Sequence, residues 1–137
     1  MIKRVFYTIK WNIRGGKRSM ELVREILLYL GEFDDKYFNG IMEINGYGKS
    51  EIDYRLQQML DENLLIGHLL YAYDEVYFHG VALSRYGYQV LDVARNDNVW
   101  LLFKNKVGNE IQTIPISVAI DVLKQLSKTY FKSKFGL

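Results

Sequence analysis

The chain has 137 residues with no cysteine, one proline and a formal net charge of +2. This length predicts one domain with an ordinary hydrophobic core, and the lack of cysteine excludes disulfides and cysteine-ligated zinc. No apolar run is long enough to cross a bilayer and no cleavable signal peptide is recognisable, so we expect a cytoplasmic protein with no membrane partner.

The small net charge hides an asymmetry along the chain. Residues 1–18 contain six basic residues and no acidic one, and residues 104–137 contain six lysines against two acidic residues. Residues 19–103 contain fourteen acidic and six basic residues. Two basic ends therefore flank an acidic body, which bears on the choice of a partner.

Residues 1–18 are predicted to form a basic N-terminal arm, and residues 19–137 a single domain. The arm is rich in aromatic residues and ends near Gly15-Gly16. Residues 14–17 can be encoded by a purine-rich stretch resembling a bacterial ribosome-binding site, so a natural start at Met20 stays open. A chain without the first 19 residues would have a net charge of −4, since six basic residues are lost.

The domain is predicted to begin with a helix and a short strand. Ser19 can cap the helix, Gly31 can stop it, and its apolar face follows a 3.6-residue period through Leu22, Val23, Ile26, Leu27 and Leu30. Residues 33–39 read as a connector, residues 40–44 as a strand, and residues 45–48 as a turn.

The next stretch is predicted to be a helix, a β-hairpin and a second helix. Ser50 can cap a helix that ends near Asn63, and strand-like runs follow at 64–73 and 76–83 with Asp74-Glu75 between them. Ser84 can cap the helix after the hairpin. This order is typical of an α+β, winged-helix-like domain with a β-hairpin wing. The short helix that a helix-turn-helix needs before the Ser50 helix is missing or rearranged.

The last part is predicted to be a helical C-terminal extension, with a short helix at 99–107 and a longer one from Pro115 to about Phe131. The apolar face of the longer helix is broad enough to pack on its own chain or on a second copy. A homodimer through residues 99–131 is therefore a hypothesis.

Several short motifs resemble those of the DUF2513 family of uncharacterised bacterial and phage proteins. They are KRSMELVREIL at 17–27, GYG at 46–48, LDENLL at 60–65, LSRYGY at 83–88, LD at 91–92, RNDNVW at 95–100, and the amphipathic helix after Pro115. At Asn63 the family usually has glycine. The resemblance runs from Lys17 to Leu137 and implies a winged-helix-like domain common in prophages and mobile elements, with no established activity.

No constellation of catalytic residues is recognisable, so we expect no enzyme, cofactor or metal. The two histidines, His68 and His79, fall in the proposed wing and could form a pair on neighbouring strands, but no carboxylate lies at a supporting spacing. The glycines fit no phosphate-binding loop.

One functional hypothesis is a regulatory protein of phage or mobile-element type that binds DNA mainly through its basic ends. A winged helix would place the Ser50 helix in the major groove, but residues 49–63 carry two basic and four acidic residues. The candidate nucleic-acid-binding residues are Lys3, Arg4, Lys10, Arg14, Lys17, Arg18, Lys49, Arg55 and Gln58.

The alternative hypothesis is a protein-binding adaptor, or an inhibitor of a host protein such as an anti-defence protein. Tyrosines crowd the acidic wing, and tyrosine is enriched at the energetic centres of protein interfaces. Alternation along the strands would turn about half of them toward the core. The candidate interface residues are Tyr71, Tyr73, Asp74, Glu75 and Tyr77.

Overall fold

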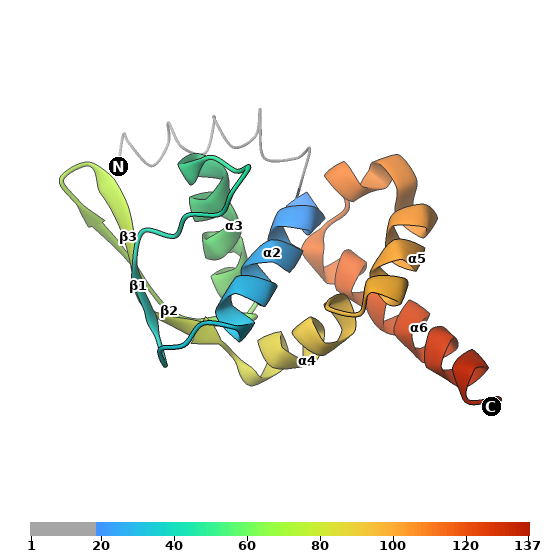
Figure 1. The fold of residues 1–137 in the computed structure, drawn as a ribbon. Coiled ribbons are helices and arrows are strands. Elements are labelled where there is room, and N and C mark those ends of the chain that lie inside the picture. The colour runs from blue at the N-terminus through green and yellow to red at the C-terminus, as the bar shows by residue number, and fades with distance from the viewer. Residues whose placement is uncertain (1–18) are drawn as a thin grey trace.

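The structure is a computed structural model that describes residues 19–137, and the predictions for the arm at 1–18 lie outside the described residues. The described part is a mixed α+β fold (Figure 1). Its elements in chain order are α2 (Ser19–Gly31), β1 (Phe38–Gly40), α3 (Lys49–Asp61), β2 (Leu65–Ala72), β3 (Glu75–Leu83), α4 (Arg85–Ala94), α5 (Asp97–Val107), the 3-10 helix η2 (Gly108–Gln112) and α6 (Ile116–Lys134).

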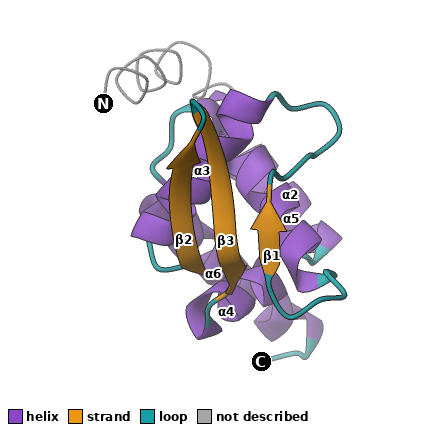
Figure 2. Cartoon of the chain, turned by 90° about the vertical axis from the view of Figure 1, so that its left-hand side faces the viewer, coloured by secondary structure: helices purple, strands orange, loops and turns teal. Residues whose placement is uncertain are grey.

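The three strands form one antiparallel sheet in the order β1-β3-β2, so β3 is central and β2 lies at an edge. Helices lie behind one face of this sheet, and in Figure 2 the other face looks toward the viewer with no described element in front of it. The predicted hairpin is confirmed, but its turn lies one residue earlier than expected. Ala72 pairs with Glu75, and Tyr73 and Asp74 both have positive φ, as a two-residue primed turn requires.

The first strand lies earlier than the sequence suggested. The chain pairs with β3 only at 38–40, and residues 41–48 form no helix or strand. Gly40 has a φ of 108°, which glycine adopts readily and which does not fit a regular β-strand, so the regular strand ends at this residue. Because no helix lies between β1 and α3, the described fold lacks the short helix that a helix-turn-helix places directly before its second helix.

Two predicted helix signals act differently from the expectation. Gly48, not Ser50, caps α3, and its N–H donates to the Glu51 carboxylate at 3.2 Å. α2 ends at Gly31 as predicted, but Gly31 is not among the residues with positive φ; a Cβ at Gly31 would lie 2.4 Å from a methyl carbon of Leu91, so glycine allows α2 and α4 to pack closely. The side chain of Ser19, predicted to cap α2, lies outside the described part.

The hydrophobic core joins the sheet to all five described α-helices. The apolar stripe predicted for the first helix is buried, and so are Ile52, Leu56 and Met59 of α3, with Leu60 half-buried at the end of that helix. The C-terminal extension also packs on this core, through Phe103 of α5 and Ile120 and Leu123 of α6. Its helices begin and end slightly outside the predicted bounds, at Asp97 and Lys134. Among the described helices, none is long and apolar enough to span a membrane.

Candidate functional site

Among residues 19–137, the outer face of the sheet is covered by no helix or strand (Figure 2). Cross-strand pairs such as Leu65–Leu83 and Leu69–Phe78 face the core, so the alternate pairs face outward. We call the outward residues the outer sheet face: Ile66, His68, Leu70, Tyr77, His79 and Ala82. Ile66 and Leu70 are each 49% exposed, and none of the six carries a carboxylate, ammonium or guanidinium group.

The wing tip carries the predicted interface tyrosines. Tyr73 is 99% exposed in the turn, next to the exposed Asp74, and Tyr71 is about half exposed. Tyr77 is half-buried on the outer sheet face, opposite Leu70. These side chains lie at or near the end of the hairpin. Glu75 lies elsewhere, because its carboxylate turns toward α3.

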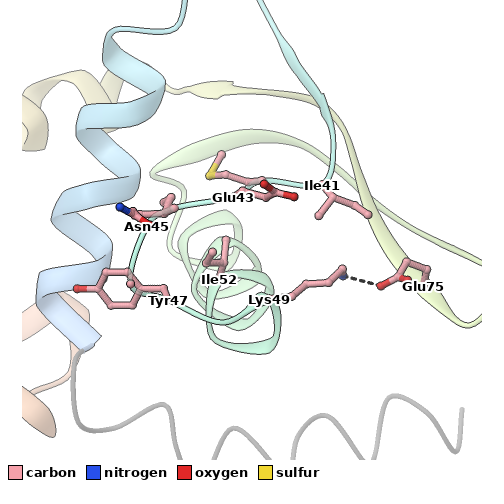
Figure 3. A pocket seen from close by; sticks show the side chains of 10 residues that line it. Ile41, Glu43, Asn45, Tyr47, Lys49, Ile52 and Glu75 are labelled. Atoms are coloured by element: carbon pink, nitrogen blue, oxygen red, sulfur yellow. Dashed lines mark ion pairs between the residues drawn. The ribbon is translucent and has the colours of Figure 1, made fainter.

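A pocket of about 650 Å³ lies between residues 41–47, the start of α3 and the base of the wing. Figure 3 shows Ile52 at its centre, Tyr47 and Asn45 on one side, and the ion pair of Lys49 with Glu75 on the other. The pocket offers an apolar floor with an amide, a phenol and charged groups at its rim. Within residues 19–137, no group of three or more His, Cys, Asp or Glu side chains could hold a metal ion.

Lys49 ties the wing to α3. Its ammonium lies 2.5 Å from the Asp53 carboxylate and 3.1 Å from the Glu75 carboxylate, and it donates to the Val76 carbonyl at 3.2 Å. Asp53 is 1% exposed, and its Oδ1 has no hydrogen-bond partner. Burial raises the pKa of the Asp53 carboxyl above its ordinary value of 3.8, although Lys49 acts in the opposite direction.

The raised pKa of Asp53 predicts a pH dependence of stability. The folded state binds this proton more tightly than the unfolded chain, so the Asp53 contribution to the free energy of unfolding falls as pH rises through the window just above 3.8. Asp53→Asn keeps an oxygen for Lys49 and cannot ionise. We expect it to gain stability relative to the native chain as pH rises through that window, measured by urea unfolding at several pH values. Asp74→Asn, at the exposed wing tip, is the control, and a difference that does not change with pH would contradict the assignment.

The predicted DNA contacts on α3 are occupied within the fold. Arg55 is 5% exposed, donates to the Gln58 side-chain oxygen, and lies with its guanidinium carbon 4.6 Å from the centre of the Tyr54 ring. Burial lowers the pKa of Arg55 from its ordinary value. Of the two basic residues of α3, Arg55 is therefore buried, and Lys49, whose side chain is 30% exposed, is paired with two carboxylates. The other six candidates, at Lys3, Arg4, Lys10, Arg14, Lys17 and Arg18, lie outside the described residues.

Exposed lysines lie instead on α5 and α6, two near the end of α5 and three near the end of α6. The hydrogen bond between Asn98 and Tyr130 shows that these two ends point in opposite directions. We use the name C-terminal basic surface for the five exposed lysines of these helices, which are Lys104, Lys106, Lys128, Lys132 and Lys134. None of them forms an ion pair with a carboxylate of residues 19–137, where the ion pairs involve only Arg24, Lys49 and Arg95 as cations. This surface matches the positive charge predicted for the C-terminal end.

Sequence reasoning missed Ile66 and Leu70 as candidate surface residues. Both alternate with the buried Leu65 and Leu69, and a strand with one wet face would normally carry polar residues at such positions. The signal in the sequence that could have identified them is that both are apolar at positions where the alternation places side chains on the exposed face.

The family-like motifs at 60–65 and 83–88 meet at one junction. Asn63 has a φ of 63°, and the N–H groups of Asn63 and Leu64 donate back to the carbonyls of Leu60 and Met59, which ends α3 in a Schellman motif. Glycine is the usual residue in this left-handed position, which explains the family preference. The Ser84 hydroxyl donates to the Asn63 carbonyl at 2.6 Å and, as predicted, caps α4 by accepting from the Gly87 N–H at 2.9 Å.

The motifs at 17–27 and 95–100 meet at a second junction. Arg24 of α2 donates to the Ala94 carbonyl at the end of α4, at 2.7 Å, and to the Asp97 carboxylate at 2.9 Å. Its guanidinium carbon lies 5.0 Å from the centre of the Trp100 ring. Asn96 caps α5 by accepting from the N–H groups of Asn98 and Val99. Several residues of the motifs that carry the resemblance therefore form contacts between helices.

Comparisons with known proteins agree with this resemblance. Residues 17–113 match the model of a family described as "Hypothetical protein (DUF2513)". The chain is 24% identical over 114 residues to an uncharacterised protein of Haemophilus influenzae (strain ATCC 51907 / DSM 11121 / KW20 / Rd), covering 82% of this chain and 93% of that protein. No solved structure matches the chain. Because the family model covers more than half of its residues, the chain belongs to the DUF2513 family.

Proposed function

We propose that this protein is a non-enzymatic, winged-helix-like regulator of phage or mobile-element type, acting in the cytoplasm by binding another protein through the outer sheet face and the wing tip. The observation that carries the proposal is the outer sheet face itself, which exposes Ile66 and Leu70 beside Tyr77 and whose six residues include no carboxylate, ammonium or guanidinium group. Exposed apolar surface of this kind, with an aromatic residue beside it, is the usual composition of an interface centre.

The winged-helix-like description rests on the order of the elements. A helix, a strand, a helix and a two-stranded hairpin follow one another, and the first strand pairs with the last. In a winged helix that reads DNA, the helix before the hairpin enters the major groove. In this chain Lys49 and Arg55 of that helix are held by groups of the fold, so the scaffold is better suited to protein recognition.

A photo-crosslinking amino acid at position 70 tests the proposal in cells that naturally produce the protein. We expect a discrete adduct with a second protein when the probe replaces Leu70 and none when it replaces Tyr88, which is equally exposed, at 49%, but lies on α4. The partner identified by mass spectrometry is then bound in purified form, and Leu70→Lys is expected to weaken that binding at least tenfold. The same adduct from both positions, or binding that Leu70→Lys leaves unchanged, would overturn the proposal.

DNA binding through the basic ends is the second candidate, and the C-terminal basic surface favours it. Lysines without carboxylate partners can neutralise phosphates, and such binding weakens steeply as salt rises. Fluorescence anisotropy with duplex DNA at low and moderate salt tests it, with Lys128, Lys132 and Lys134 changed together to alanine. We expect this variant to bind less tightly and with a smaller salt dependence, while Lys36→Ala, on the loop before β1, binds as the native chain. No binding at low salt would reject this candidate.

A further inference from the structure

Strand β2 lies at the edge of the described sheet, and its pairing with β3 has a register irregularity between Ile66 and His68. It pairs with β3 on one side, and no other described strand lies beside it (Figure 2). Over its eight residues, LIGHLLYA, it has no charged residue and no proline. Natural edge strands usually carry a lysine, a proline or an inward-pointing charge that prevents pairing with another chain. In the sequence, the acidic residues that flank β2 are Asp61 and Glu62 before it and Asp74 after it, and Glu75 pairs with its last residue, Ala72, from β3.

The exposed edge indicates what kind of group can cover it. A row of backbone N–H and C=O groups is matched by the same row on another extended strand. The outward side chains along the edge, which include Ile66, His68 and Leu70, carry no carboxylate, ammonium or guanidinium group, so an identical strand in antiparallel orientation brings no two such groups of like charge face to face. Apolar side chains from both copies would then lie against each other across the new pair.

Charge argues against the other self-association surface. Pairing α5 and α6 with the same helices of a second copy would bring the two C-terminal basic surfaces together. Their lysines have no carboxylate partners within residues 19–137, so the approach would be repulsive. The exposed Leu101 and Leu102 on α5 lie on a helix that also carries Lys104 and Lys106.

We propose that a second copy of this chain adds its β2 antiparallel to β2 of the first, which makes one six-stranded sheet across the dimer. The two outer sheet faces then form one continuous surface. This pairing does not depend on the protein partner proposed above, because it uses the backbone edge of β2 and its test needs only the purified chain.

Sedimentation velocity over a range of protein concentrations tests the pairing. We expect the native chain to shift from the 16.1-kDa monomer to twice that mass as concentration rises. Leu70→Lys places two lysines near each other in the pair and is expected to remain monomeric, whereas Leu101→Lys and Tyr88→Lys dimerise as the native chain does. A native chain that stays monomeric, or a dimer that Leu101→Lys abolishes and Leu70→Lys does not, overturns the proposal.

Hydrogen exchange of the native chain provides a second measurement that does not rely on a folded Leu70→Lys variant. In the dimer, the backbone N–H groups of β2 that point away from β3 gain a hydrogen-bond partner. We therefore expect their exchange to slow at least tenfold between low and high protein concentration. Amides of α2, buried in both states, serve as the internal reference. Exchange of β2 that does not change with concentration would contradict the pairing even if a dimer forms.

Discussion

Gly87→Ala is expected to lower the free energy of unfolding by about 3 kcal/mol, the upper end of the range for overpacked sites. A Cβ at Gly87 would lie 2.1 Å from the Leu64 carbonyl oxygen and 3.1 Å from its carbon, and both are backbone atoms. The same carbonyl accepts a hydrogen bond from the Ser84 N–H at 3.0 Å, so it cannot move away without breaking that bond. The start of α4 and the end of α3 would have to separate.

Urea unfolding followed by the fluorescence of Trp100, which is buried in the core, measures this loss. Trp11 is first replaced by phenylalanine so that one tryptophan reports. Gly48→Ala is the matched control, because a Cβ there meets only a flexible Glu51 oxygen at 3.7 Å and the backbone φ of −80° suits any residue. We expect the control to lose less than about 1 kcal/mol, mainly from the poorer helix cap. Equal losses in the two variants would show that close packing at Gly87 is not the cause.

Local patterns predicted the helices well because their information lies within a few residues. The stripe from Leu22 to Leu30 repeats with the helical period, and Ser84 bonds to an N–H only three residues away. Gly31 shows the limit of such reasoning. Its position at the end of an apolar stripe correctly suggested a helix stop, but the close packing that requires glycine there is set by Leu91, sixty residues later in the chain.

The first strand and the hairpin turn were placed with small errors for a similar reason. Residues 40–44 are apolar enough to read as a strand, but pairing with β3 is limited to residues 38–40, where Phe38 lies opposite Val81. The turn at Tyr73-Asp74 lacks the Asn-Gly signature, so the pair Asp74-Glu75 looked equally suitable. Glu75 belongs to the strand, and its carboxylate binds Lys49 of α3.

The candidate site was predictable in part. Tyr71 and Tyr73 could be proposed as surface residues because a hairpin end is usually exposed, and the structure places both in solvent. Arg55 could not be assigned from the sequence, since an arginine on a helix is buried or exposed according to which neighbours cover it. Net charge predicted that α3 is a poor surface for phosphate, and the burial of Arg55 is consistent with that prediction.

Arg24→Met is expected to lower the free energy of unfolding by about 2–3 kcal/mol, because it leaves the Ala94 carbonyl without its charged donor and removes the guanidinium from the Trp100 ring. The side chain of Arg24 is 15% exposed, so water replaces its hydrogen bonds poorly, and methionine keeps most of its apolar length. Urea unfolding of the variant measures the loss. Arg24→Lys keeps the charge without the planar guanidinium group. Its free energy of unfolding is expected to lie between those of the native chain and Arg24→Met.

The partner residue Asp97 separates the two roles that Arg24 could have. Its side chain is 95% exposed, and ion pairs of exposed groups contribute little to stability. We expect Asp97→Ala to lose less than about 1 kcal/mol, including its effect at the first turn of α5. If Asp97→Ala instead matches Arg24→Met, the ion pair is the main interaction. If it does not, Arg24 stabilises the fold chiefly by binding the carboxyl end of α4 and covering Trp100, which would explain why both ends of this joint lie in motifs shared with the family.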